Sequence, residues 1–329
     1  MSTLKTSSLL EEFEDLFVEV RAQALMNVLE NATAAIEKER QIGYITGGKV
    51  NSQVVEMDSI PEELVIIGDI HGDLQSLLWV LKDIDFETRL TNPNNKLIFL
   101  GDYVDRGSNS IGVLYIVCYL KQKFPNSVIL MRGNHEAPAE FPFSSHDLPL
   151  RLTQQYGHKM AKSIYGNKII PLFRLLSLIV RIPKQLLIVH GGLPTGDDLI
   201  LSIRSRNTLG SAVHDPFIDS TAMEEILWND PMEHIDNGLD WEYSRRGYGK
   251  HFAITVSERW LEASSSKLVI RGHEPCQGFK INHHGMILTL FSCKEAYPGF
   301  QAAYIRITRE QLQNLHDGPE FVPYIKKVP

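Results

Sequence analysis

Short apolar runs alternate with longer segments of helical spacing in the middle of the chain. The runs at 64–67, 97–100 and 128–131 are continuously apolar, which is typical of strands buried on both faces. Helical spacing follows the first run at 74–84 and the second at 110–123. Two strand–helix–strand units in succession predict a parallel sheet, because such crossovers join parallel strands.

Later apolar runs indicate more strands. They lie at 186–189, 268–270, 286–291 and 302–307. Polar and apolar residues alternate in the last run, which favours a second, mixed or antiparallel sheet. The pattern therefore predicts an α/β fold.

The amino-terminal segment has helical spacing of its own. Apolar residues recur from Leu9 to Leu29 after a capping-box pattern that begins at Ser8, and they predict one long amphipathic helix over 8–40. We expect its apolar stripe to pack on the rest of the chain; docking of a partner on this helix is the alternative. Glycines and Pro61 make residues 41–60 look like a connector.

Composition narrows the class of protein. The chain has 329 residues, of which 43% are apolar and 22% charged, and its net charge is -7. Without a block of basic residues, we expect neither nucleic acid nor an anionic membrane as a partner. We also expect no export signal and no membrane span. Three cysteines without a CxxC pair fit a reducing cytoplasm.

Polar residues capable of metal binding follow five of the predicted strands. They are Asp69 and His71, then Asp102 and Asp105, then Asn134 and His135, then His190, and finally His273. Open α/β sheets bind ligands at the carboxyl ends of their strands, so we expect these side chains to meet in one crevice. Glycines beside most of them permit tight turns and close approach.

The ligand types indicate the metals. Carboxylates, imidazoles and a carboxamide without thiolate suit manganese, iron or zinc, and there are enough of them for two ions. In hydrolases with two metals, the ions share a carboxylate and a bridging water that attacks the phosphorus directly. Asp102, from the middle motif, is the candidate bridge.

A phosphate ester needs further groups. Arg106 offers a fork of donors for phosphate oxygens, and His135 can protonate the leaving oxygen. Asp105 could orient His135 and raise its pKa. No protein nucleophile is needed. For the other histidines, His146, His158, His214, His283 and His284, we expect a surface or structural role.

The motifs together resemble a known family. GDIHGD at 68–73, GDYVDRG at 101–107 and RGNHE at 132–136 are followed by HGGL at 190–193, LWNDP at 227–231 and RGH at 271–273. Over about 62–308 the chain resembles the phosphoprotein phosphatases, which are metal-dependent serine/threonine phosphatases. The resemblance implies a calcineurin-like metallophosphoesterase β-sandwich, built of two mixed sheets flanked by helices.

The resemblance also implies roles for individual residues. One metal would be held by Asp69, His71 and Asp102, and the other by Asp102, Asn134, His190 and His273. His135 would be the general acid and Asp105 its orienting carboxylate. Substrate phosphate would be bound by Arg106, Arg246, Asn134 and Tyr297. The chain then divides into an extension and connector at 1–60, a catalytic domain at 61–310 and a short tail at 311–329.

Three features depart from the family pattern. Asp73 stands where the eukaryotic enzymes usually carry Gln, residues 136–185 share little with them, and SCKEAY at 292–297 replaces a shorter segment. The chain looks more like an archaeal or other divergent member than a eukaryotic catalytic subunit.

The expected function is hydrolysis of phosphoserine and phosphothreonine in proteins. Two alternatives stay open from the sequence. One is hydrolysis of small phosphates such as dinucleotide polyphosphates, although Asp105 argues against it, because relatives with that activity generally lack this residue. The other is an inactive binding module that uses the amino-terminal helix as a scaffold.

Overall fold

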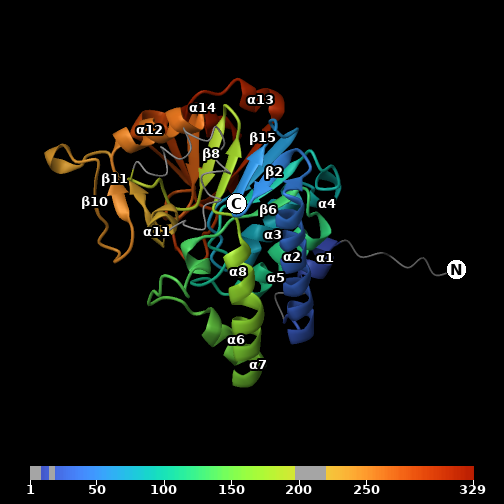
Figure 1. Ribbon diagram of the computed structural model, residues 1–329. Coiled ribbons are helices and arrows are strands. Elements are labelled where there is room, and N and C mark those ends of the chain that lie inside the picture. The colour runs from blue at the N-terminus through green and yellow to red at the C-terminus, as the bar shows by residue number, and fades with distance from the viewer. Residues whose placement is uncertain (1–8, 15–18, 197–219) are drawn as a thin grey trace.

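Two large β-sheets face each other in the computed structural model, and helices cover their outer sides (Figure 1). The structure describes residues 9–14, 19–196 and 220–329. The strands of the two large sheets are β1 (Tyr44–Ile45), β2 (Gly48–Asn51), β3 (Val54–Met57), β4 (Glu63–Ile67), β5 (Lys96–Phe99), β6 (Val128–Leu130), β7 (Ile179–Ile182), β8 (Leu186–Val189), β12 (Leu268–Arg271), β13 (Phe279–Asn282), β14 (Ile287–Leu290), β15 (Ala302–Thr308) and β16 (Ile325–Val328).

The smaller of these two sheets has the order β16-β15-β4-β5-β6. Strands β4, β5 and β6 are parallel, which confirms the prediction from the three continuously apolar runs. Strand β15 lies antiparallel to β4, so the sheet is mixed. The run at 302–307 therefore belongs to this sheet and not to a second one. It is flanked on both sides by strands, and most of its residues are buried.

The second sheet has the order β1-β2-β3-β7-β8-β12-β14-β13. Parallel pairing joins β8, β12 and β14, and antiparallel pairing joins β7 to β8 and β13 to β14. The expected sandwich of two mixed sheets is therefore confirmed. A small sheet of β9 (Asp230–Pro231), β10 (Trp241–Tyr243) and β11 (Lys250–Phe252) lies beside it.

Alternate residues of each strand serve different cores. Leu64 and Ile66 of β4 belong to the core between the sheets, together with Ile188 of β8. Val65 and Ile67 point the other way and join the core under the helices. Both faces of β4 are thus apolar, because side chains alternate across a strand.

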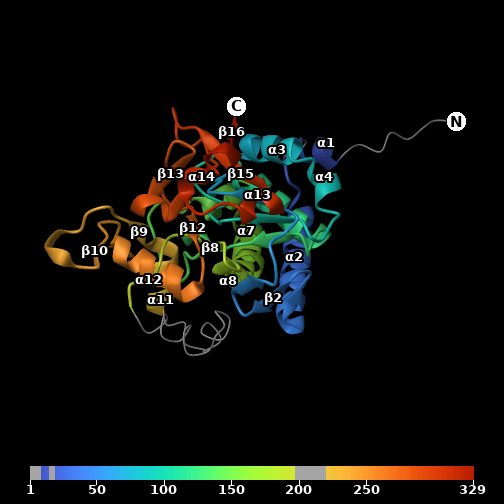
Figure 2. The ribbon, with the colours of Figure 1, turned by 90° about the horizontal axis from the view of Figure 1, so that it is seen from above.

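Helices flank the sandwich on opposite sides (Figure 2). Helices α3 (Leu74–Asp83) and α5 (Ser110–Lys123) agree with the helices predicted at 74–84 and 110–123. The helices are α1 (Leu9–Glu14), α2 (Ala22–Ile42), α3 (Leu74–Asp83), α4 (Phe86–Arg89), α5 (Ser110–Lys123), α6 (Leu148–Tyr156), α7 (His158–Ile164), α8 (Ile170–Leu175), α11 (Ser220–Trp228), α12 (Ile254–Ser264), α13 (Arg309–Gln313) and α14 (Gly318–Phe321). Within the described ranges, no helix is both long and apolar enough to cross a bilayer.

The amino-terminal segment does not form one continuous helix. Helix α1 ends at Glu14, residues 19–21 are not helical, and α2 begins at Ala22. Ser8 and residues 15–18 of the expected helix, like His214, lie outside the described residues. The expected packing is confirmed, because Phe13, Leu25 and Leu29 belong to the core that also contains apolar residues of α5.

The segments expected as a connector and a tail are parts of the sheets. Residues 44–57 form β1, β2 and β3, and β3 pairs in parallel with β7. After α13 and α14, strand β16 adds to the edge of the smaller sheet beside β15. The glycines at 43 and 47 have positive φ and lie in turns around β1, so they separate short strands. Turn residues alone cannot distinguish a linker from a hairpin, which is why these strands were not expected from the sequence.

Candidate functional site

The six predicted metal ligands converge at one end of the sandwich. Each follows the carboxyl end of a strand: Asp69 and His71 follow β4, Asp102 follows β5, Asn134 follows β6, His190 follows β8 and His273 follows β12. All six are buried. The facing ends of strands from both sheets therefore form one polar centre, as the spacing of the motifs predicted.

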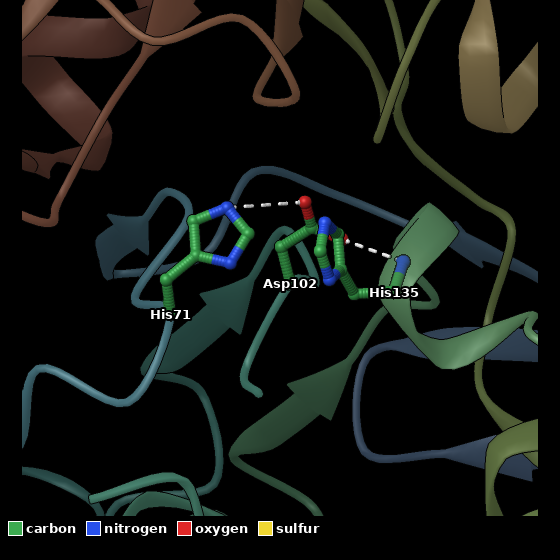
Figure 3. A group of neighbouring side chains, drawn as sticks. All are labelled: His71, Asp102 and His135. Carbon is green, nitrogen blue, oxygen red and sulfur yellow. Dashed lines mark hydrogen bonds and ion pairs between the residues drawn. The ribbon is translucent and has the colours of Figure 1, made fainter. Parts of the chain in front are cut away.

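One group of possible ligand atoms belongs to His71, Asp102 and His135, within 4.8 Å of one another (Figure 3). His71 donates from Nδ1 to the carbonyl of Val104 at 3.0 Å. Its Nε2 atom lies 3.5 Å from Oδ2 of Asp102. The backbone contact fixes the ring and directs the other nitrogen to the centre, an arrangement common among metal-binding histidines.

A second group consists of Asp102, His190 and His273, also within 4.8 Å of one another. His190 donates from Nδ1 to the carbonyl of Leu100 at 2.9 Å and directs Nε2 to Asp102, 3.4 Å away. The side-chain amide of Asn134 lies 3.1 Å from Nε2 of His190 and 2.9 Å from Nδ1 of His273. Asp102 is common to both groups, which suits a carboxylate shared by two cations.

Asp69 supplies an independent test of whether a cation fits here. Its Oδ1 atom accepts a hydrogen bond from the backbone N–H of His273 at 3.0 Å. Its Oδ2 atom is buried and has no hydrogen-bond partner among the described residues. Burial and the nearby charge of Asp102 raise the pKa of this carboxyl well above its usual value. A buried carboxylate oxygen without a partner is costly, and a bound cation would remove that cost.

The electrostatics favour neutral imidazoles around a charged carboxylate. Burial lowers the pKa of His71 to about 3 and also lowers the pKa values of His190 and His273. Burial opposes ionisation of Asp102 too, but the imidazoles of His190, His135 and His71 hold its pKa at about 2. Neutral imidazole and ionised carboxylate are the forms that bind metals.

The backbone at the centre is strained. His71, Asp102 and His273 have φ values of 45°, 52° and 70°, in the left-handed region that residues with a Cβ seldom adopt. Gly272 also lacks room for a side chain, because a Cβ there would lie 2.2 Å from Oδ1 of Asp69. The close approach expected from the neighbouring glycines is thus confirmed at this position.

His135 and Asp105 form a buried pair next to the candidate ligands. Nδ1 of His135 lies 2.6 Å from Oδ2 of Asp105. On the opposite side of the ring, Nε2 lies 3.1 Å from Nη2 of Arg106, and Arg106 also donates to the hydroxyl of Tyr297. Hydrogen bonds from His135 and His146, against the effect of burial, hold the pKa of Asp105 well below its usual value.

Arg246 reaches the same centre from the hairpin between β10 and β11. Its Nη1 atom lies 2.8 Å from Nε2 of His273, and Nη2 lies 3.5 Å from Asp230. Both predicted arginines therefore lie at the site, and each is exposed enough to meet a ligand from solvent.

Three residues at the site had no role in the sequence interpretation. Glu136 is fully buried and accepts hydrogen bonds from the backbone N–H groups of Asp102 at 2.7 Å, Tyr103 at 2.9 Å and Gly133 at 3.0 Å. It thereby fixes the turn that carries Asp102. Its position as the last residue of the RGNHE motif is the feature of the sequence that could have indicated this role. The other two residues are Asp73 and His146.

Asp73 joins two regions that depart from the family pattern. Its carboxylate accepts from the backbone and the hydroxyl of Ser76, and so caps α3. The same carboxylate accepts from the backbone N–H groups of Lys294 at 2.9 Å and Glu295 at 3.1 Å. Asp73 therefore anchors the altered segment that carries Tyr297.

Comparisons with known proteins agree with this geometry. Residues 63–277 match the family model described as calcineurin-like phosphoesterase. Serine/threonine-protein phosphatase T of Schizosaccharomyces pombe is 35% identical over 237 residues, which are 70% of this chain and 46% of that protein. The catalytic subunit of serine/threonine-protein phosphatase 6 of Caenorhabditis elegans is 31% identical over 244 residues, which are 71% of this chain and 65% of that protein.

A solved structure supports the fold. A protein serine/threonine phosphatase from Saccharomyces cerevisiae superimposes with a TM-score of 0.74 at 22% identity, covering 100% of this chain and 96% of that chain. The chain spans 40% to 65% of the length of the curated relatives it matches. The family match covers most of the chain and includes the six converging candidate ligands, together with His135 and Asp105. The chain therefore belongs to the calcineurin-like phosphoesterase family.

Proposed function

We propose that this protein hydrolyses phosphoserine and phosphothreonine in proteins, with His135 as the general acid. The observation that carries the proposal is the buried pair of His135 and Asp105 beside a centre that can hold two metals. The relatives named as serine/threonine phosphatases support the class of substrate.

We propose that one ion is held by Asp69, His71 and Asp102, and the other by Asp102, Asn134, His190 and His273. His135 lies within 4.8 Å of the first group, but both of its ring nitrogens already contact other side chains. Asp69 has a buried oxygen without a partner, which makes it the better ligand. Manganese, iron or zinc would suit this mixture of imidazole and oxygen donors.

When bound, two divalent ions supply Lewis-acid stabilisation and lower the pKa of water toward neutrality. The protein supplies the remaining chemistry. Arg106 and Arg246 bind the phosphate oxygens, with Asn134 and Tyr297 beside them. Once Arg106 has turned from His135 to the phosphate, Nε2 of His135 can carry a proton and give it to the leaving oxygen of the serine or threonine side chain, while Asp105 holds the opposite nitrogen. No protein nucleophile takes part.

The catalytic machinery would then lie within residues 61–310, and the segments 1–60 and 311–329 would support it structurally. Every proposed site residue lies between Asp69 and Tyr297. Cys118, Cys276 and Cys293 are free thiols, which supports a cytoplasmic location.

Substrate preference separates this proposal from its alternatives. We expect the manganese-loaded protein to release phosphate from a phosphothreonine peptide much faster than it cleaves diadenosine tetraphosphate. Faster cleavage of the dinucleotide would favour a small-molecule phosphoesterase. Activity on neither substrate, with metal bound, would favour a binding module. In the same assay, His135→Ala should lose most of the activity on the peptide. His158→Ala, at an exposed histidine, is the matched control.

A further inference from the structure

His146 lies on the segment that departs most from the family pattern, between the short helical turn at Asn134–Glu136 and α6. Its side chain is only 11% exposed. Nδ1 of His146 lies 2.8 Å from Oδ2 of Asp105, the same oxygen that Nδ1 of His135 contacts at 2.6 Å. Two histidines therefore share one carboxylate oxygen, and only one of them was expected there.

The same segment also binds the other oxygen of Asp105. Oδ1 accepts hydrogen bonds from the backbone N–H groups of Asp147 and Leu148, each at 2.9 Å, at the start of α6. A carboxylate has about four acceptor positions, and all of them are used here. Three of the four bonds come from residues 146–148. Rotation of the Asp105 carboxylate would break these bonds. The segment therefore fixes the orientation of the carboxylate that holds His135.

His146 is itself fixed in orientation. The carboxylate can only accept, so Nδ1 of His146 carries the proton in that contact. Nε2 lies 2.7 Å from the hydroxyl of Tyr165. Burial raises the pKa of Tyr165 to about 12, so its hydroxyl keeps its proton and can donate it to Nε2. Phe143 packs edge-on against both histidines, with ring centroids 4.5 Å from His135 and 5.6 Å from His146.

We propose that His146 is a positioning residue for the general acid, acting on His135 through the shared oxygen of Asp105. This inference rests on the proposed function, in which His135 protonates the leaving group. Both ring nitrogens of His146 are engaged, one by Asp105 and the other by Tyr165. His146 keeps Asp105 in the orientation that aims Nε2 of His135 at the site.

The kinetic test compares two leaving groups. A phosphothreonine peptide releases an alkoxide that needs a proton, whereas p-nitrophenyl phosphate releases a phenolate that needs little help. We expect His146→Ala to lower kcat on the peptide roughly 10-fold, a part of the full contribution of general acid catalysis, with little change in KM. The loss on p-nitrophenyl phosphate should be smaller. Metal content should not change.

The conservative variant separates positioning from general damage. In His146→Asn the amide nitrogen can take the place of Nδ1 and donate to Asp105, so kcat on the peptide should largely recover. The control His158→Ala, at an exposed histidine, should match the wild type. Equal losses on both substrates, or no recovery in His146→Asn, would overturn the inference.

A readout independent of turnover covers the case in which the proposed function itself fails. In the zinc-loaded protein, the Nδ1 proton of His135 should give a downfield proton resonance that disappears in His135→Ala. We expect His146→Ala to shift this resonance and His158→Ala to leave it in place. If His146→Ala leaves it unchanged, the inference is wrong, whether or not the protein hydrolyses either substrate.

Discussion

The metal-binding centre and the surroundings of His135 are built in different ways. Candidate ligands such as Asp69, Asp102 and His190 each follow a strand of the sandwich, and the sheets determine where they meet. The surroundings of His135 come from irregular segments, which supply His146 and Tyr297. A side chain at a strand end is positioned by the regular backbone hydrogen bonds of the sheet. A side chain in a loop is positioned by a few individual hydrogen bonds. We therefore expect substitutions in the centre to abolish metal binding, and substitutions around His135 to change the rate of hydrolysis.

The largest effect is expected at the shared ligand. Asp102→Asn removes the one carboxylate common to both groups, so both ions and the activity should be lost. Metal analysis of the purified variant measures the loss. Asp58→Asn, at an exposed aspartate, is the matched control and should retain both ions. Retention of one ion by Asp102→Asn would contradict a bridging role.

A large effect without metal loss is expected at the acid. His135→Ala should slow hydrolysis of a phosphothreonine peptide roughly 100- to 10,000-fold, the range of general acid catalysis. Metal content should stay at the wild-type level, because both ring nitrogens of His135 contact other side chains. If the variant instead loses an ion, His135 is a ligand, and the boundary between the two regions lies elsewhere.

A smaller effect is expected at Asp73. Asp73→Asn weakens the bonds that hold the backbone of Lys294 and Glu295, and bonds to a charged group are worth about 1.5–3 kcal/mol. Because this segment carries Tyr297, we expect KM for the peptide to rise up to about 10-fold, with little change in kcat. Steady-state kinetics beside the exposed control Asp85→Asn measure this. An unchanged KM would show that Asp73 only caps α3.

The smallest effect concerns protons. Burial and Asp102 raise the pKa of Asp69, so the metal-free protein should hold a proton on a carboxyl that must ionise to bind a cation. Manganese binding should then release about one proton, and apparent affinity should increase as pH rises. Calorimetry in buffers of different ionisation enthalpy counts the proton. Release should disappear in Asp69→Asn; if it persists there, another group supplies the proton.

Much of the fold and of the centre could be predicted from local signals. Continuously apolar runs indicated β4, β5 and β6, and polar residues shortly after each run indicated the candidate ligands. The flanking segments could not be predicted in the same way. Residues 44–57 are three short strands that pair with one another and join the sheet only through the pairing of β3 with the distant β7, and their turns resemble a connector. A strand of a few residues carries too little periodicity to be recognised without its partner.

The sequence by itself determined the α/β class, and it indicated the candidate ligands at the strand ends and the pair of His135 and Asp105, each from residue type and position within a motif. Only the tertiary structure decided how that pair is held. His146 lies in no motif, and Asp73 was noticed only as a departure within GDIHGD. Their contacts join Asp105 to a segment more than 40 residues away and α3 to one more than 200 residues away. Such contacts depend on where the packed sheets bring distant loops, which no local pattern records.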